Sequence, residues 1–238
     1  MLESLKEEIC KANQELPNSG LVKLTWGNVS GIDRAKGIFG IKPSGIDYGD
    51  LKPSDIVLID MEGQKVEGQL NPSSDTKTHL EIYKAWPEVG GVTHTHSFSA
   101  TVLAQAGKEL PCYGTTHADH FYGTVPVCRA LDQDELADDY EKNTGSIIVK
   151  HFLDNNIDPI KIPAVLQHHH APFTWGKTAM KSLENSIALE YCAKMAIDCW
   201  NIDENLSPIP QYILDKHFLR KHGPEAYYGQ NTTDLESL

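Results

Sequence analysis

The order of helix-like and strand-like segments constrains the fold more than any other feature of this sequence. Short runs rich in β-branched residues alternate irregularly with segments in which apolar residues recur at helical spacing. Two of the strand-like runs, residues 56–60 and 65–67, are joined by Glu62-Gly63 and predict a β-hairpin. Because a hairpin makes neighbouring strands antiparallel, we predict an α/β fold with a mixed, mainly antiparallel central sheet.

The expected elements cover most of the chain. Helices are predicted at residues 2–16 (ending before Pro17), 76–86, 97–106, 132–141, 147–153, 178–200 and 211–222. Further strands are predicted at residues 21–25, 37–41, 92–96, near 125 and 162–169, with a long loop over 111–123.

Composition narrows the class of protein. No Gly/Ser linker or low-complexity stretch divides the 238 residues, so a single domain over 1–238 is expected. A net charge of −12 argues against a nucleic-acid partner, and no apolar run approaches the roughly 18 residues that span a membrane. The first residues are too charged for a signal peptide, and the five cysteines are odd in number and scattered. Both features predict a cytoplasmic protein with reduced thiols.

The residues with the clearest chemistry are His94 and His96. Spaced by two in a β-branched run, they would lie on one face of a strand with both imidazoles pointing the same way. Imidazole is a common zinc ligand, and a catalytic zinc needs about three protein ligands with one position left open. The pair therefore predicts half of a metal site.

The remaining ligands are less well determined by the residues alone. Residues 168–170 form a run of three histidines after an apolar stretch, and on a continuing strand His168 and His170 would share a face. Asp75, just before a predicted helix, is either a helix cap or a carboxylate near the metal; its position favours the cap.

Three predicted loops contain residues suited to phosphate binding. They are Gly27-Asn28, Ser44-Gly45 and Ser73-Ser74, the last opening a helix, and Lys42 could add a cation. Taken singly, each pair is more typical of a turn or an N-cap.

Candidate acid–base groups occur in two further segments. The first contains His117, Asp119 and His120. In the second, His217 and Arg220 share a helix face, where they could contact an anion or only complement the helix dipole.

The motifs together resemble those of a known family. They are residues 26–30 (WGNVS), 42–45 (KPSG), 72–76 (PSSDT), 94–97 (HTHS), 114–119 (GTTHAD), 214–223 (LDKHFLRKHG) and 227–230 (YYGQ). In this order, over nearly the whole chain, they are similar to the L-ribulose-5-phosphate 4-epimerases of the class II aldolase/adducin family. The resemblance implies a three-layer αβα fold and a zinc-dependent isomerase that interconverts L-ribulose 5-phosphate and D-xylulose 5-phosphate by breaking and re-forming the C3–C4 bond.

The resemblance also implies roles for individual residues. One zinc per subunit, with Mn²⁺ or Co²⁺ as possible substitutes, would be bound by Asp75, His94, His96 and His170. The acid–base pair would be Asp119 and Tyr228, with His120 as a competitor. Substrate would be bound by Gly27, Asn28, Lys42, Ser44, Gly45, Ser73, Ser74, His217 and Arg220.

Family members assemble as homotetramers with active sites at subunit interfaces, so a neighbour would supply Tyr228. The alternative activity within this fold is a class II aldolase acting on a ketose 1-phosphate such as L-fuculose 1-phosphate. The epimerase reaction serves both arabinose catabolism and ascorbate or gulose catabolism.

Overall fold

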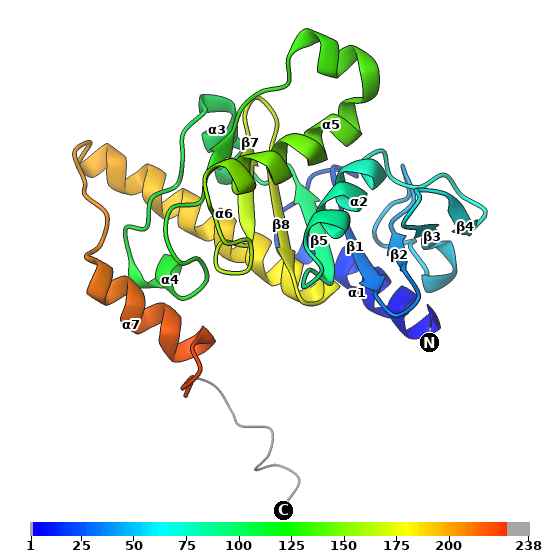
Figure 1. Cartoon of the computed structure of the whole chain (residues 1–238), viewed down its shortest axis with the longest axis horizontal. Coiled ribbons are helices and arrows are strands. Elements are labelled where there is room, and N and C mark those ends of the chain that lie inside the picture. The colour runs from blue at the N-terminus through cyan, green and yellow to red at the C-terminus, as the bar shows by residue number, and fades with distance from the viewer. Residues whose placement is uncertain (1, 228–238) are drawn as a thin grey trace, which may run out of the picture.

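The computed structural model describes residues 2–227, which fold around one sheet covered by helices (Figure 1). The helices are α1 (Leu2–Asn18), α2 (Thr76–Ala85), α3 (Phe98–Ala106), α4 (Thr115–Ala118), α5 (Gln133–Asp154), α6 (Ala179–Ile202) and α7 (Gln211–His222), with a 3-10 turn at Pro53–Asp55. The strands are β1 (Gly27–Asp33), β2 (Ile38–Ile41), β3 (Val57–Asp60), β4 (Lys65–Glu67), β5 (Gly91–Thr95), β6 (Val127–Cys128), β7 (Ala164–Gln167) and β8 (Pro172–Gly176). No helix in this part of the chain is long and apolar enough to cross a membrane.

The sheet confirms the predicted mixed, mainly antiparallel topology. Its strand order is β4-β3-β2-β1-β5-β8-β7-β6, and each neighbouring pair is antiparallel except β6 with β7. In the middle of the sheet, β5 pairs with β1 on one side and β8 on the other, with His94 opposite both Asn28 and Phe173. This register brings residues far apart in sequence to one end of the sheet.

Helices cover both faces of the sheet, as the αβα expectation requires. The apolar sides of α2 and α5 pack on one face through Ile82, Tyr83 and Ile148. On the other face, α1 and the start of α6 bury residues such as Ile9 and Leu183. Figure 1 shows α2 and α5 in front of the sheet and α1 and α6 behind it. The result is a three-layer αβα sandwich.

The first predicted strand is wrong. Residues 21–25 form no strand, because Leu24 takes a left-handed backbone conformation with φ of 51° that ends any extended run. The strand instead begins at Gly27 and runs to Asp33, with small residues at Gly27, Ser30 and Gly31. Small residues are required there, since a Cβ on Gly31 would lie 3.1 Å from Ile9 Cγ1 and 3.3 Å from Ala179 Cβ. Gly27-Asn28 is therefore the start of a central strand rather than a loop.

Other departures from the predicted elements are smaller. Pro17 lies inside the last turn of α1, β8 was not predicted, and the predicted loop contains the short helix α4. The two helical stretches predicted after residue 131 are one helix, α5, with a kink at Asp139 where φ is −149° and ψ is 85°. Strand β7 ends at Gln167, so the three histidines lie in a turn rather than on a strand.

Gly91 is a sensitive position in the strand that carries the histidines. A Cβ there would lie 2.4 Å from Thr178 O and 2.5 Å from Ala179 Cα at the start of α6. We therefore expect Gly91→Ala to lower the free energy of unfolding by roughly 1–3 kcal/mol, the usual cost of overpacking, in chemical denaturation. Gly49→Ala is the matched control because nothing lies within 4 Å of its Cβ. Equal stability of the two variants would contradict this packing argument.

Candidate metal centre and active site

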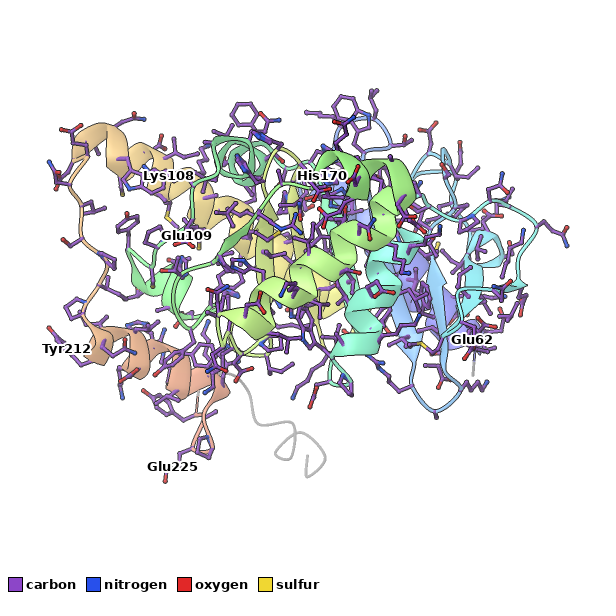
Figure 2. All side chains as sticks on the ribbon, turned by 45° about the horizontal axis from the view of Figure 1, so that its top comes forward. Glu62, Lys108, Glu109, His170, Tyr212 and Glu225 are labelled. Atoms are coloured by element: carbon purple, nitrogen blue, oxygen red, sulfur yellow. The ribbon has the colours of Figure 1, made fainter. Side chains whose placement is uncertain are left out.

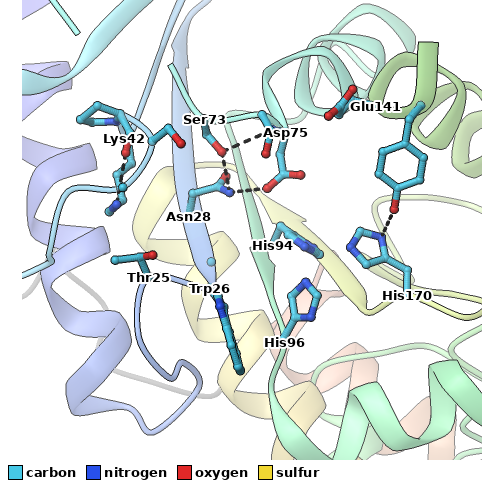
Figure 3. A pocket seen from close by; sticks show the side chains of 16 residues that line it. Thr25, Trp26, Asn28, Lys42, Ser73, Asp75, His94, His96, Glu141 and His170 are labelled. Carbon is cyan, nitrogen blue, oxygen red and sulfur yellow. Dashed lines mark hydrogen bonds between the residues drawn. The ribbon is translucent and has the colours of Figure 1, made fainter. Parts of the chain in front are cut away.

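Three histidines from two segments meet at one end of the sheet (Figure 3). His94 lies on β5, His96 follows the end of that strand, and His170 lies in the turn between β7 and β8. One nitrogen from each ring lies within 4.8 Å of the others. The predicted convergence of His94, His96 and His170 is therefore present.

The turn conformation selects His170 from the run of three histidines. His169 has φ of 63°, in the left-handed region, and this reverses the chain after Gln167. His168 stacks on His169 with ring centroids 3.7 Å apart and packs against Gly107. The prediction that His168 and His170 share one face of a strand is thus wrong, because these residues lie in a turn. His170 is nevertheless the residue that reaches the cluster.

The three imidazoles are held in the neutral, metal-binding form. Burial is the main cause that lowers the pKa of His94 and of His170 to about 3, and it also lowers the pKa of His96. His94 Nδ1 donates to Pro172 O at 2.9 Å, and its ring stacks on Phe173 at 4.1 Å. Because Nδ1 carries the proton in this hydrogen bond, Nε2 is left with a free lone pair.

Asp75 does not cap α2, although it occupies the N-cap position. Its carboxylate instead accepts a hydrogen bond of 2.6 Å from Asn28 Nδ2, which also contacts Ser73 Oγ at 3.1 Å. Asn28 Oδ1 is buried and has no partner among the described residues. The predicted capping role is thus wrong, and the carboxylate faces the cavity that contains the histidines.

The donor set fits a catalytic divalent metal. Three neutral imidazoles leave one coordination position open, as zinc enzymes require. Asp75 lines the same cavity but is not one of the three residues whose ligand atoms lie within 4.8 Å of one another, so its predicted role as a metal ligand stays a prediction. A closed structural site would want four ligands of its own. His94, His96 and His170 would hold the ion, with Asp75 as the adjoining carboxylate.

The predicted phosphate-binding residues line the same cavity as the histidines. Its volume is about 600 Å³, and the lining includes Gly27, Asn28, Lys42, Ser44, Gly45, Ser73 and Ser74 together with Asp75 and the three histidines. Lys42 is buried at 2% exposure, lies 5.0 Å from the Tyr48 ring centroid and donates to the Pro43 carbonyl at 3.2 Å. Burial lowers its pKa. Among residues 2–227 no carboxylate is in hydrogen-bonding contact with Lys42, and a buried cation of this kind is suited to an anionic ligand.

Five residues that line the cavity were not among the predicted site residues: Thr25, Trp26, Pro43, Tyr140 and Glu141. Tyr140 and Glu141 line it from α5. Periodicity gave no signal for them, because the kink at Asp139 turns this part of the helix toward the cavity.

The candidate acid–base residue Asp119 lies in a separate cluster between α4 and α7. Its carboxylate accepts hydrogen bonds from Arg220 at 2.9 and 3.0 Å and from His217 at 3.2 Å, and Lys221 lies 3.1 Å away. Burial alone would raise the pKa of Asp119, but these hydrogen bonds outweigh it and lower the pKa. Asp119 is thus held as a carboxylate, the form that accepts a proton.

This cluster lies outside the histidine cavity within one chain. Neither Asp119 nor His217 nor Arg220 lines the cavity. In Figure 2, His170 lies far from Tyr212, in the first turn of α7, and from Glu225, just after this helix. His120 lines a different cavity beside Lys181 and Lys221, and Tyr228 lies outside the described residues.

Comparison with known proteins identifies the family of this chain. The model of the class II aldolase and adducin N-terminal domain matches residues 7–197. The chain therefore belongs to the class II aldolase and adducin family. Over 229 residues it is 48% identical to the L-ribulose-5-phosphate 4-epimerase UlaF of Salmonella paratyphi A and to that of Salmonella typhi, covering 96% of this chain and all of each relative.

Proteins of known structure share this fold. An L-fuculose 1-phosphate aldolase superposes with a TM-score of 0.76 at 28% identity, covering 90% of this chain and 94% of that one. YgbL of Klebsiella pneumoniae, a putative aldolase/epimerase/decarboxylase, gives a TM-score of 0.72 at 18% identity, covering 91% and 98%, and supports the fold alone.

Proposed function

We propose that the protein is a zinc-dependent L-ribulose-5-phosphate 4-epimerase that interconverts L-ribulose 5-phosphate and D-xylulose 5-phosphate. The observation that carries the proposal is the single cavity lined both by the three histidines and by the phosphate-binding residues. The 48% identical relatives that bear this name favour the epimerase over an aldolase acting on a ketose 1-phosphate.

The chemistry at C4 explains why metal and phosphate sites adjoin. The hydrogen on C4 is not adjacent to a carbonyl, so breaking and re-forming the C3–C4 bond is easier than deprotonation. The bound metal supplies Lewis-acid stabilisation of the negative charge that develops on the sugar oxygens as this bond breaks. Lys42, Ser44 and Ser73 hold the phosphate of the aldehyde fragment, which rotates to present its other face without leaving the site.

Inversion also requires proton transfer at the C4 oxygen in each of its two orientations. Asp119 and Tyr228 are the proposed pair. Because the Asp119 cluster lies outside the cavity of its own chain, we propose that a second copy supplies it, in a homotetramer with active sites at the interfaces.

Exposed apolar side chains beside the cavity support this assembly. Trp26, a lining residue, is 54% exposed, and Phe98, two residues after His96, is 81% exposed. His217 and Arg220 would then approach the substrate of the neighbouring copy. A cytoplasmic location and a role in pentose catabolism, such as that of arabinose, complete the proposal.

Turnover tests the proposal directly. The purified protein is incubated with L-ribulose 5-phosphate while D-xylulose 5-phosphate is measured, and in parallel with L-fuculose 1-phosphate while released aldehyde is measured. Formation of xylulose phosphate supports the epimerase. Aldehyde release without any epimerisation would replace it with the aldolase.

Lys42→Met tests phosphate binding. Hydrogen bonds to charged groups contribute about 1.5–3 kcal/mol, so we expect KM for L-ribulose 5-phosphate to rise roughly 10–100-fold. Inhibition by inorganic phosphate should weaken in parallel. Lys36→Met, at the exposed β1–β2 turn, is the control. An unchanged phosphate inhibition constant in Lys42→Met would remove Lys42 from the phosphate site.

A further inference from the structure

Tyr140 makes a direct contact with one of the metal-site histidines. Its hydroxyl lies 3.3 Å from His170 Nδ1, and the two ring centroids are 6.0 Å apart with the planes at 48°. This hydrogen bond is the dashed line at His170 in Figure 3. Within residues 2–227 this is the one side-chain hydrogen bond that His170 makes. Any restraint on the rotation of this imidazole by hydrogen bonding therefore comes from Tyr140.

His170 needs such a restraint more than His94 does. His94 lies on a central strand, bonded through Nδ1 to Pro172 O and stacked on Phe173. His170 lies in a turn and is only half-buried. A histidine that donates from Nδ1 keeps its Nε2 lone pair for a metal. The Tyr140 oxygen is positioned to accept that proton.

The backbone around Tyr140 is fixed by contacts with α2. Lys77 Nζ lies 2.7 Å from Asp139 Oδ2 at the kink of α5, and Thr78 Oγ1 donates to Glu141 O at 2.6 Å. These two contacts flank Tyr140 on both sides. The kink that turns the tyrosine toward His170 is thus pinned from the neighbouring helix.

The two helices also approach each other closely. A Cβ added to Gly145 of α5 would lie 2.7 Å from Glu81 Cβ and 2.9 Å from Thr78 O of α2. The residue before α2 is Asp75, which faces the same cavity. One packed helix pair therefore brings both Asp75 and Tyr140 to the histidine cluster.

We propose that Tyr140 is a positioning residue for the metal centre: its hydroxyl accepts the Nδ1 proton of His170 and orients the ring so that Nε2 faces His94 and His96. The inference rests on the proposed metal site but not on the identity of the sugar. The kink of α5 would thus hold Tyr140 over the turn between β7 and β8.

The test compares Tyr140→Phe, which removes only the hydroxyl, with Tyr140→Leu, which also removes the ring. Zn²⁺ affinity is measured by competition with a chromophoric chelator, and the geometry of the site by the visible spectrum of the Co²⁺ protein. Loss of a hydrogen-bonding partner of a metal-bound histidine typically weakens metal affinity about 10–100-fold, and we expect this loss in both variants together with a shifted Co²⁺ spectrum. Tyr113→Phe is the matched control, because the Tyr113 hydroxyl accepts a hydrogen bond from Trp200 Nε1 away from the cavity.

Thermal melting of the metal-free variants separates loss of metal affinity from loss of fold. Wild-type affinity and spectrum in Tyr140→Phe would overturn the proposal, and so would a loss confined to Tyr140→Leu, since the ring alone would then matter. A wild-type protein that binds no Zn²⁺ would overturn it as well. A wild-type protein that binds Zn²⁺ but does not convert L-ribulose 5-phosphate would refute the proposed function and leave this affinity test intact.

Discussion

Removing the metal with a chelator is expected to lower kcat for epimerisation by at least about a thousandfold, and added Zn²⁺ is expected to restore it. The reason is the charge that develops on the sugar oxygens as the C3–C4 bond breaks. A divalent ion contributes several kcal/mol to its stabilisation, and each 1.4 kcal/mol is about tenfold in rate. Turnover is measured on one preparation before chelation, after it and after add-back.

A histidine substitution tests whether the metal acts at the cluster of His94, His96 and His170. His94→Ala removes the proposed ligand whose ring is held by the Pro172 carbonyl and the Phe173 ring. We expect it to lose activity to the same extent and to gain none on Zn²⁺ addition. His168→Ala is the matched control, since His168 packs against Gly107 and lines no part of the cavity. Full activity after complete chelation would refute the metal-dependent mechanism.

The helices were largely predictable because their signal is local. The segment 211–222 was predicted with the bounds of α7, and α2, α3 and α6 each differ from prediction by one or two residues at an end. The central strands were harder. Strand β1 contains Gly27, Asn28, Ser30 and Gly31, which are not typical strand residues. The reasons lie in tertiary contacts, since a Cβ on Gly31 would crowd α1 and α6 and the Ser30 hydroxyl is hydrogen-bonded to His79 and Tyr83 of α2.

The sequence was enough to identify most residues of the candidate site, but not the contacts that bring them together. His94 and His96 share one strand-like run, so local spacing was enough to pair them. The approach of His170 depends on the pairing of β5 with β8 and on the left-handed conformation of His169, and neither is encoded in a local period. The resemblance, not the residues, chose His170 over His168. The hydrogen bond between Asp75 and Asn28 also joins residues far apart in sequence. Helix-cap preferences consider only neighbouring residues, so they could not predict it.

Asp119→Asn is expected to lower kcat for epimerisation by about 100–10,000-fold, the usual contribution of a positioned general base. Asparagine preserves the shape of the side chain but accepts no proton, so the loss should fall on kcat rather than on KM. Asp215→Asn is the matched control, because Asp215 is a carboxylate on α7, the helix that contacts Asp119, but it is bonded to Tyr122 and Gln211 instead. A control that loses as much activity would indicate damage to α7 rather than loss of a base.

Mixing Asp119→Asn with His94→Ala then tests whether one site is built from two chains. Each variant alone is expected to keep no more than about a hundredth of wild-type activity, but a hybrid assembly contains sites in which the intact histidines of one copy face the intact Asp119 of another. In a ring with head-to-tail interfaces and random mixing, about a quarter of the sites combine both intact parts. Co-refolded variants should therefore recover about a quarter of wild-type activity. If Asp119 served the cavity of its own chain, every site would lack one part and mixing would restore nothing.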